Sequence, residues 1–497
     1  MRISLVNVQF HEGNNMFPPL GLMYVAAALR EAGHRVQVLD GDPLLEVDMV
    51  DRIVAFEPEL IGMSFLTMTI ARASQLSQQL RQTLPDIPLM LGGPHVTAEP
   101  ARSHVDFAAD IVVIGEGERS AVEIAERLEN GDHLDGIPGT LTAAGKGPPR
   151  LAIDDLDSVP FPARDLLEFE RYLSPPGLIR GWASSRHASM LASRGCPFRC
   201  TFCASHLQLG RRFRLRSVEN VLAELDHLVD RYAIKGVYWV DDIFTGDRAW
   251  VRELCAALRQ RPYKLEWGCQ SRVTGIDRVT LEAMRDAGCV QIDFGVESGS
   301  QKILNRMRKG TRPDTIRKAF ELVHDVGLRT GASFIFGTPG EEEDDAQQTI
   351  ELARQLKSDW TVFFFSTPYP GTELWGQVRE TSFFELFPDY GEAWNNRQRQ
   401  TPFAMTNLTP DQLAVFRKLA QNEAFRRNYL HPRNIGYAAR LTSVALKRPR
   451  LIGQALSIAM RGGRLDDAVE AWFAADRAQV TTRRWRQSEQ ALLNQVL

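Results

Sequence analysis

The chain has 497 residues, enough for about three domains of ordinary size, and its 44% hydrophobic and 24% charged residues are typical of soluble globular proteins. The net charge of −3 argues against a general nucleic-acid binder, and no apolar run approaches the ~20 residues that span a bilayer. The first residues lack the apolar core of a signal peptide, and the six cysteines show no paired framework, so we expect a cytoplasmic protein.

Residues 1–135 alternate short β-rich runs with amphipathic segments, the pattern of a parallel sheet covered by helices. This rhythm predicts a Rossmann-like, flavodoxin-like doubly wound domain, whose ligands lie beyond the carboxyl ends of the strands. The expected strands are Arg2–Val8, Arg35–Leu39, Leu60–Ser64, Leu89–Leu91 and Ile111–Ile114, and the expected helices are Leu20–Ala32, Leu44–Phe56, Ile70–Leu84, Ala98–His104 and Arg119–Leu128.

Glycines follow several of these strands, as in Gly92-Gly93 after the fourth and Gly115-Glu116-Gly117 after the fifth. A glycine there lets the backbone approach a flat or bulky ligand closely. The first strand is not followed by G-x-G-x-x-G, which argues against a nicotinamide site. Residues 136–185 are rich in Gly, Pro and Asp and are predicted to be a linker, with a small hairpin within 139–151.

Residues 186–395 again alternate strands and helices, which predicts a partial (β/α)6 barrel with its site at the carboxyl-terminal mouth of the strands. The expected strands are Ala188–Ser193, Gly236–Val240, Leu265–Gln270, Val290–Val296, Arg329–Phe336 and Trp360–Ser366. The helices expected between them are Val218–Tyr232, Arg248–Gln260, Thr280–Ala287, Thr311–Val326 and Asp344–Leu356.

Three cysteines, Cys196, Cys200 and Cys203, lie within eight residues in the spacing C-x3-C-x2-C. Three thiolates from one short loop suit an iron–sulfur cube, and a fourth iron without a cysteine is open to another ligand. A zinc site would instead favour two C-x2-C pairs, which Cys255, Cys269 and Cys289 do not supply. We interpret those three as small buried hydrophobic residues.

This loop resembles the signature of the radical S-adenosylmethionine (SAM) superfamily, with Phe202 in its aromatic position. The resemblance implies a [4Fe–4S] cluster whose open iron chelates SAM and releases a 5′-deoxyadenosyl radical. It also places SAM-binding residues at the strand ends, where carboxylates accept hydrogen bonds from an ammonium and an arginine binds a carboxylate. Besides Phe202, the SAM-binding residues implied are Asp241, Asp242, Gln270, Arg272, Glu297, Ser298, Gly337 and Pro368.

The N-terminal domain resembles cobalamin-binding domains, which carry D-x-H-x-x-G, then S-x-L, then G-G. Ser64 with Leu66 and Gly92 with Gly93 match the second and third motifs, whereas Gln9, His11 and Asn14 stand in the first. Without the aspartate, His11 is either a lower cobalt ligand or an ordinary polar loop residue. The cobalamin-binding residues implied are His11, Leu20, Gly21, Ser64, Leu66, Gly92, Gly93, Pro94, Gly115, Glu116 and Gly117.

Two further charged features are interpreted as ordinary surface. The run from Arg306 to Gly310 is expected to be a solvated helix end, and Asp314 and Asp344 are expected to be solvated helix starts.

Residues 396–497 predict a helical domain, with a stretch from Arg426 to Arg464 that is basic and lacks acidic residues. That stretch is either a peripheral contact with an anionic membrane or a solvated cap over the barrel.

The combined layout resembles cobalamin-dependent radical SAM enzymes. It implies a C-methyltransferase that moves a methyl group from SAM through methylcobalamin to an unactivated carbon of a small molecule, with an external donor of the flavodoxin or ferredoxin type. The same layout occurs in ring-forming enzymes such as the anaerobic tetrapyrrole ring cyclase. A non-catalytic cobalamin or SAM sensor is a third possibility. No second cysteine cluster or RNA-binding domain of a tRNA-modifying enzyme is visible.

Overall fold

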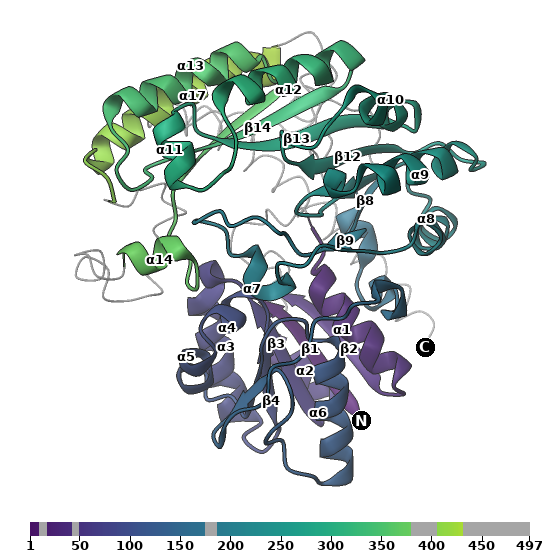
Figure 1. Cartoon of the computed structure of the whole chain (residues 1–497). Helices are drawn as coiled ribbons and strands as arrows, with labels where there is room; N and C mark the ends of the chain where they lie inside the picture. The colour runs from purple at the N-terminus through teal and green to yellow at the C-terminus, as the bar shows by residue number, and fades with distance from the viewer. Residues whose placement is uncertain (9–16, 42–48, 174–185, 379–404, 431–497) are drawn as a thin grey trace, which may run out of the picture.

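The computed structural model describes residues 1–8, 17–41, 49–173, 186–378 and 405–430. An N-terminal α/β domain lies below a larger α/β domain in Figure 1, and the short strand β9 (Ser193–Arg194) and helix α7 (Ser205–Leu209) lie where the two meet.

The N-terminal domain contains a seven-stranded sheet in the described part of the chain, in the order β2-β1-β3-β4-β5-β6-β7. The first five strands are parallel, which confirms the predicted flavodoxin-like order. These strands are β1 (Arg2–Val8), β2 (Arg35–Gly41), β3 (Leu60–Phe65), β4 (Leu89–Gly92) and β5 (Ile111–Val113), and the antiparallel hairpin that extends them is β6 (Thr140–Thr142) and β7 (Gly145–Lys146).

Helices cover both faces of this sheet, because the strands are apolar on both sides. Ile3 and Leu5 face α1 and α6, whereas Val6 and Val8 face the core on the side of α2 and α3. The helices are α1 (Leu20–Glu31), α2 (Met49–Phe56), α3 (Ile70–Thr83), α4 (Pro94–Ala98), α5 (Pro100–Asp106) and α6 (Glu118–Asn130), and the short 3₁₀ turn before α3 is η2 (Thr67–Thr69).

One predicted helix is wrong. The segment expected to be a single helix from Ala98 to His104 is divided between α4 and α5, with Glu99 between them in a non-helical conformation. Each of the two helices begins at a proline, Pro94 and Pro100, because a proline lacks the amide hydrogen that a helix interior requires. The first part of the helix expected at Leu44–Phe56 lies outside the described residues.

The segment predicted to be a linker does more than join the domains. Its first part forms β6 and β7 and continues the N-terminal sheet, and its second part forms three 3₁₀ turns, η3 (Leu156–Ser158), η4 (Arg164–Leu166) and η5 (Phe169–Tyr172). Arg164 of η4 is 2% exposed and forms an ion pair of 2.6 Å with the fully buried Glu224 of the second domain. The linker is therefore anchored in the barrel domain rather than lying on its surface.

The second domain contains a six-stranded parallel sheet among the described residues, in the order β15-β14-β13-β12-β11-β8. All neighbouring pairs are parallel, as the predicted (β/α)6 barrel requires. The strands are β8 (His187–Met190), β11 (Gly236–Trp239), β12 (Glu266–Ser271), β13 (Cys289–Glu297), β14 (Arg329–Phe336) and β15 (Trp360–Phe365).

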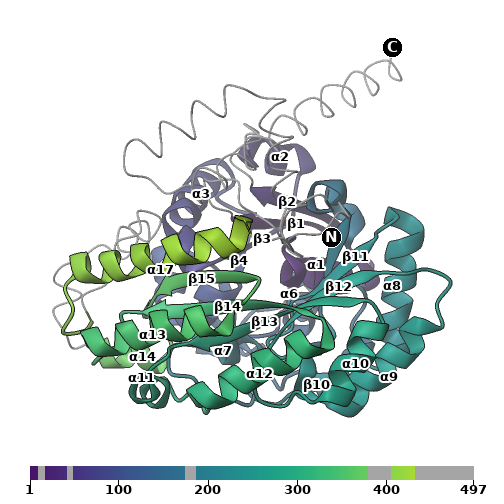
Figure 2. The same cartoon turned by 90° about the horizontal axis from the view of Figure 1, so that it is seen from above.

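Helices lie along the outer side of this curved sheet, as Figure 2 shows from above. Ser217, Asp247 and Asp277 begin three of them, and each side chain accepts a hydrogen bond from a backbone amide of the first turn. The helices are α8 (Val218–Tyr232), α9 (Arg248–Arg259), α10 (Arg278–Asp286), α11 (Gln301–Arg306), α12 (Pro313–Val326), α13 (Glu343–Leu356) and α14 (Glu373–Val378); η6 (Phe244–Gly246) is a 3₁₀ turn, and β10 (Arg214–Leu215) pairs antiparallel with β9.

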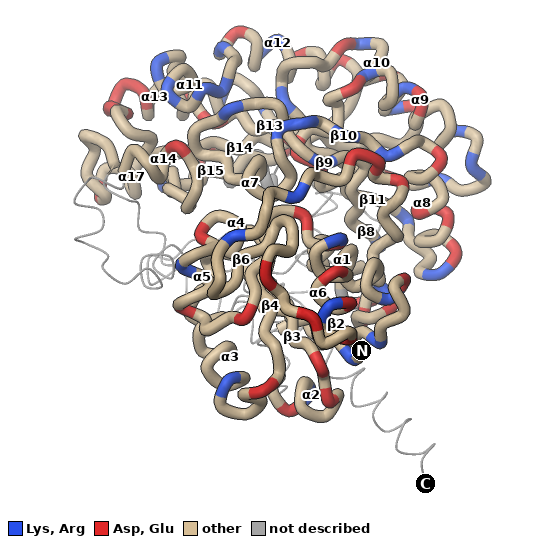
Figure 3. Tube along the Cα trace, turned by 60° about the horizontal axis from the view of Figure 1, so that its bottom comes forward, with Lys and Arg blue, Asp and Glu red and all other residues tan. Residues whose placement is uncertain are grey.

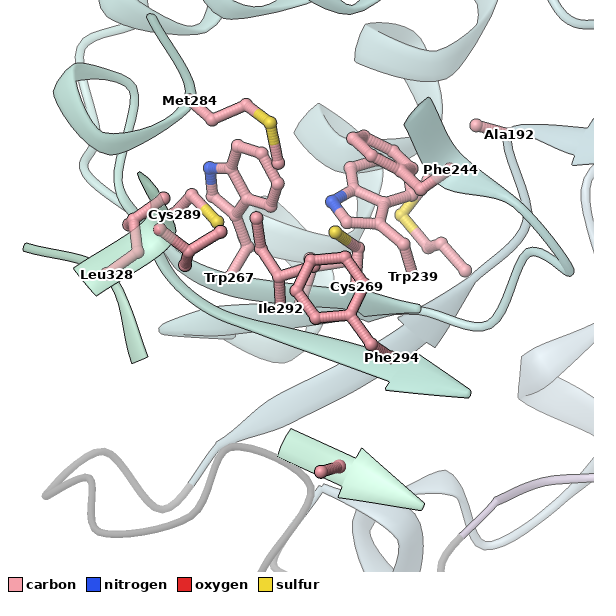
Figure 4. Close-up of a cluster of buried hydrophobic side chains, with 14 of the residues drawn as sticks. Ala192, Trp239, Phe244, Trp267, Cys269, Met284, Cys289, Ile292, Phe294 and Leu328 are labelled. Carbon is pink, nitrogen blue, oxygen red and sulfur yellow. The ribbon is translucent and has the colours of Figure 1, made fainter. Parts of the chain in front are cut away.

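The barrel core is built around Trp239 and Trp267, each 1% exposed, with Phe244 stacked on Trp239 at a centroid distance of 5.2 Å (Figure 4). Cys269 and Cys289 lie in the same cluster, and Cys255 is also buried, which confirms their interpretation as small hydrophobic residues. The strand residues of this core point toward the outer helices. Because side chains alternate along a strand, their neighbours point into the barrel interior.

The last described helix, α17 (Pro410–Leu430), packs on β15 and α13 through Leu413 and Phe416. Most of the basic stretch from Arg426 to Arg464 lies outside the described residues, as do the later helices predicted for 396–497. In the part of the chain that the structure describes, no helix is both long and apolar enough to cross a membrane. Acidic and basic positions are interspersed along the helices that Figure 3 shows.

Candidate active site

The loop that carries the three cysteines begins at β9 and leads into α7, at the junction of the two domains. Gly195 has a φ of +89°, and a Cβ there would lie 2.2 Å from the carbonyl oxygen of Arg212, so this turn requires glycine. The amide of Cys196 donates to the carbonyl of Gly210 over 3.2 Å, and the amide of Thr201 donates to the carbonyl of Met307 over 3.0 Å. The loop is thus fixed at several points of its backbone.

The three thiols share one partly buried space. The pKa of the Cys203 thiol is raised to about 11, mainly by burial and to a smaller extent by the nearby Asp242 carboxylate and the other two thiols. All three cysteines are free and half-buried. Among the described residues, no group of side chains converges as the ligands of a single metal ion would. In an iron–sulfur cube each thiolate binds a different iron, so the three thiols need not converge on one point.

Arg272, at the end of β12, holds this loop in place. Its guanidinium lies 3.7 Å from the ring centroid of Phe198 and donates to the Cys200 sulfur over 3.5 Å. It also donates to the carbonyl oxygen of Lys309. The sequence predicts that Arg272 binds the SAM carboxylate, and the structure places Arg272 beside the cysteine loop.

Lys309 corrects one of the sequence interpretations. In the run expected to be a solvated helix end, Arg306 and Arg308 are exposed, but Lys309 is only 6% exposed. Its ammonium forms a 2.6 Å ion pair with the buried Glu297 and lies 5.9 Å from the ring centroid of Phe202. A run of charges usually marks a surface, and nothing in its pattern showed that one member turns inward.

Glu297 lies in a strained segment beside the same loop. Its φ is +69°, in a region that residues other than glycine seldom occupy, and the pairing of β13 with β14 shifts register between Gly295 and Glu297. A Cβ on Gly295 would lie 2.4 Å from the Glu297 carboxylate, so glycine makes room for the ion pair. Strain of this kind is concentrated at functional sites.

The two aspartates that follow β11 have different surroundings. Asp241 is fully buried and accepts hydrogen bonds from the amide of Ala192 at 3.0 Å and from the amide and hydroxyl of Ser193 at 2.5 Å each. Burial raises its pKa to about 7, although these hydrogen bonds favour the ionised form. Asp241 therefore positions the segment that leads into the cysteine loop, whereas Asp242 is exposed and accepts from the Ser205 hydroxyl.

The remaining predicted SAM-binding residues are spread over the strand ends. Gln270 is exposed, and Pro368 is buried in the segment after β15. Ser298 is fully buried, and its hydroxyl forms a 3.0 Å hydrogen bond with the Thr349 hydroxyl. This hydrogen bond therefore joins two parts of the barrel wall. The Gly337 amide donates to the fully buried Glu341 carboxylate.

Glu341 gives a prediction about pH and stability. One carboxylate oxygen accepts from the amides of Gly337 and Thr338, and the other has no hydrogen-bond partner among the described residues. Burial raises its pKa to about 7 despite those hydrogen bonds. Because the folded state holds the proton more tightly than the unfolded state, this group costs stability as pH rises from about 5 to 8, by about 2 kcal/mol.

Glu341→Gln is therefore expected to remove about 2 kcal/mol of the stability loss between pH 5 and pH 8, measured by urea unfolding at both values. Glu343→Gln, at an exposed position on the same segment, serves as the control and should keep the wild-type pH dependence. Equal pH dependence of Glu341→Gln and wild type would contradict the assignment.

A cavity of ≈ 480 Å³ lies at the carboxyl edge of the N-terminal sheet. This is the size of pockets that bind organic ligands. The barrel domain also contributes lining residues to this cavity, namely Leu191, Arg194, Gln208 and Leu209. Among its lining residues are all the described positions predicted to bind cobalamin: Leu20, Gly21, Ser64, Leu66, Gly92, Gly93, Pro94, Gly115, Glu116 and Gly117.

The glycines of this cavity fit a large ligand. A Cβ on Gly21 would meet nothing within 4 Å, and one on Gly92 would meet only the Val113 Cβ at 4.0 Å, so both face open space. Gly93 differs, because its φ is +94° and a Cβ there would lie 2.5 Å from the Ser64 hydroxyl oxygen. None of the described lining residues is a histidine, and His11 lies outside the described residues.

Gly93→Ala is expected to weaken hydroxocobalamin binding at least about tenfold, because the side chain displaces Ser64 and strains the turn at the cavity floor. Equilibrium dialysis with hydroxocobalamin measures the effect. Gly131→Ala is the matched control: Gly131 also has a positive φ, of +71°, but nothing lies within 4 Å of its added Cβ. If both variants bind as wild type does, Gly93 does not shape a cobalamin site.

Comparisons with known proteins agree with this geometry. Residues 190–353 match the Radical SAM superfamily, and residues 10–125 match the B12 binding domain. An uncharacterised methyltransferase of Pyrococcus horikoshii is 35% identical over 368 residues, which cover 72% of this chain and 78% of the relative. The chain belongs to the radical SAM superfamily, in the group with a B12-binding domain. Its cofactors are accordingly a [4Fe–4S] cluster, SAM and cobalamin.

Other relatives of this radical SAM enzyme include the anaerobic magnesium-protoporphyrin IX monomethyl ester cyclase of Rubrivivax gelatinosus, 28% identical over 76% of this chain and 70% of the relative. Among solved structures, the radical SAM methyltransferase TsrM from Kitasatospora setae, with cobalamin and a [4Fe–4S] cluster bound, aligns with a TM-score of 0.63. It is 19% identical, and the alignment covers 76% of this chain and 74% of that one, so it shows the shared fold.

Proposed function

We propose that this enzyme is a cobalamin-dependent C-methyltransferase that acts on a small molecule. The observation that carries the proposal is the shared wall of the two sites: Arg194 and Leu209, on either side of the cysteine loop, line the cavity formed by the strand-end glycines. When bound, cobalamin supplies a methyl group and SAM at the cluster supplies the radical that removes a hydrogen atom from an unactivated carbon. The protein must hold both groups close to one substrate carbon.

In this proposal different side chains of the protein bind the cluster, SAM and cobalamin. Cys196, Cys200 and Cys203 bind three irons of the cluster. Asp242 offers a carboxylate to the SAM ammonium, and Arg272 offers a cation to the SAM carboxylate beside Cys200. In the cavity, the glycine backbones at the ends of β4 and β5 would allow a flat corrin ring to approach closely, and Ser64 and Leu66 would be among the residues that hold it.

The barrel interior is suited to a substrate with an apolar body. Phe363 and Phe365 belong to the outer core, so Val362 and Phe364 face the opposite side of β15. Phe364 is 46% exposed and pairs in register with Ile335 of β14. These side chains form an apolar wall that a small organic molecule can occupy.

Polar groups form the other wall of the interior, near the large cavity. The Tyr238 hydroxyl donates to Asp293 over 2.5 Å, and the Tyr238 ring lies 6.2 Å from that of Phe17, which itself lines the cavity. The barrel interior and the cavity therefore meet at Phe17. A substrate in the barrel interior would then lie next to the cavity, as methyl transfer requires.

Ring formation without methyl transfer is the second candidate, because the cyclase of Rubrivivax gelatinosus matches over most of both chains. The third candidate is a sensor that performs no chemistry, and such a protein would not cleave SAM. The contacts that hold the cysteine loop, from Arg272 and Asp241, favour a catalytic site over a sensor.

The deciding experiment uses anaerobically purified protein with a reconstituted cluster, hydroxocobalamin, a reduced flavodoxin-type donor and SAM with an isotopically labelled methyl group. Host metabolite extract is added, and products are followed by mass spectrometry. A labelled product together with 5′-deoxyadenosine and S-adenosylhomocysteine supports methyl transfer. A product without added carbon supports the ring-forming candidate, and absence of SAM cleavage supports the sensor. No iron in the protein would contradict all enzymatic candidates.

A further inference from the structure

Arg194 belongs to both candidate cofactor sites. It ends β9, lies two residues before Cys196, and also lines the large cavity. It is 7% exposed, so its charge is almost entirely within the protein. A buried guanidinium needs anionic partners, because removing it from water without them is costly.

The partners of Arg194 come from the rim of the cavity, far away in sequence. Its guanidinium forms ion pairs of 3.0 Å with Glu116 and 2.7 Å with Glu118, in the segment that leads from β5 into α6. It also lies 4.8 Å from the ring centroid of Tyr24 on α1. Three sides of the guanidinium are thus held by the N-terminal domain.

Glu116 extends this connection to the other end of the cysteine loop. Its second oxygen accepts from Arg214 of β10 over 2.9 Å, and Arg214 donates to the carbonyl of Leu209 over 2.8 Å. Leu209 ends α7 and, like Arg194, lines the cavity. Both ends of the segment that carries the cysteines are therefore tied, through arginines, to one carboxylate on the cavity rim.

We propose that Arg194 is a positioning residue shared by the two sites, which couples cobalamin binding in the cavity to the state of the cysteine loop. Backbone hydrogen bonds hold the path of the cysteine loop, and a cluster on the three thiolates would restrict its remaining motion. The restricted loop would hold Arg194 more firmly against Glu116 and Glu118, and these side chains would keep the cavity rim in the shape that receives the corrin ring. By linkage, cobalamin in the cavity stabilises the loop by the same amount. This inference rests on the proposed function, since it requires cobalamin in the cavity.

The test measures the dissociation constant of hydroxocobalamin by equilibrium dialysis for wild type and Arg194→Met, each with and without the reconstituted cluster. For wild type we expect affinity to fall about fivefold when the cluster is absent, in the range of ordinary coupling between sites. Arg194→Met should bind about tenfold more weakly than cluster-loaded wild type, the effect of losing charged hydrogen bonds, and its affinity should not depend on the cluster.

Two further variants separate positioning from general damage. Arg212→Met removes an exposed arginine next to the same loop, which pairs with Asp154 at 2.6 Å, and should keep both the affinity and its cluster dependence. Arg194→Lys keeps the positive charge, but one ammonium cannot pair with two carboxylates and also contact the Tyr24 ring. This variant should therefore bind hydroxocobalamin more tightly than Arg194→Met but more weakly than wild type. Should Arg194→Met fail to fold, Glu118→Gln replaces it and is expected to shift affinity in the same direction by less.

Cluster-loaded Arg194→Met that binds hydroxocobalamin as tightly as wild type would overturn the inference, as would wild type whose affinity ignores the cluster. A wild-type protein that contains iron and binds no hydroxocobalamin at all would overturn this inference and the methyltransferase proposal together. A failure confined to the comparison of variants leaves that proposal standing, so the two failures are distinguishable.

Discussion

Replacing Cys200 by serine is expected to reduce bound iron from about four atoms per chain to nearly none and to reduce 5′-deoxyadenosine release at least about a thousandfold. In the proposed site three thiolates from one loop bind the cluster, and two would not hold it against loss of iron. The fold should persist, because the loop backbone is held independently by the Cys196 and Thr201 amides and by Asp241. Iron and sulfide analysis, and chromatography of the SAM products after reduction, measure both effects.

Cys255→Ala is the control for this experiment, since Cys255 is buried in the barrel core far from the loop in sequence. It should retain iron and SAM cleavage, with at most a modest loss of stability. If Cys200→Ser retains the full iron content, a fourth ligand outside the loop must take its place, and the interpretation of C-x3-C-x2-C as the complete protein ligand set would be wrong.

Replacing Glu224 by glutamine is expected to lower the free energy of unfolding by about 3–5 kcal/mol, the usual cost of breaking a buried ion pair by removing one partner. Glu224 is fully buried in α8 and pairs with Arg164 at 2.6 Å and with Arg216. Both arginines are nearly inaccessible to solvent, at 2% and 5% exposure. Without the carboxylate, the partners that the structure describes for the two buried cations would be carbonyl oxygens and aromatic rings, none of which carries a negative charge.

Chemical denaturation monitored by circular dichroism measures this loss of stability. Glu219→Gln, at an exposed position in the first turn of the same helix, is the matched control and should change stability by only a few tenths of a kcal/mol. Since Arg164 belongs to the segment between the domains, we also expect Glu224→Gln to weaken hydroxocobalamin binding. Stability equal to that of wild type would show that solvent reaches the arginines.

Features encoded by local sequence were predictable in this protein. The strands from Arg2 to Val8 and from Arg329 to Phe336 follow from their apolar patterns, and the structure has the same bounds. The cysteine spacing predicts a cluster loop because three ligands within eight residues need no distant partner. The glycines after β4 and β5 marked a ligand edge because parallel strands bring their carboxyl ends to one side of a sheet.

Local patterns failed where a distant part of the chain determines a residue's environment. The run around Lys309 has the composition of a surface, yet Lys309 is buried because the strained turn at Glu297 presents a carboxylate to it. Asp241 follows a strand as a ligand-binding aspartate would, but the segment between β8 and the cysteine loop brings the Ala192 and Ser193 amides to it. The linker composition gave no sign that Arg164 is anchored by Glu224.

The sequence by itself determined the type of fold, the cluster loop and the edge at which a cobalamin site is expected, because each depends on residues close together in the chain. Only the tertiary structure decided how the two sites are joined. Arg194 and Glu116 are 78 positions apart, and their pairing exists because the chain path brings the cysteine loop onto the cavity rim. Long charged side chains find such partners only after the domains have packed, and no local pattern contains that information.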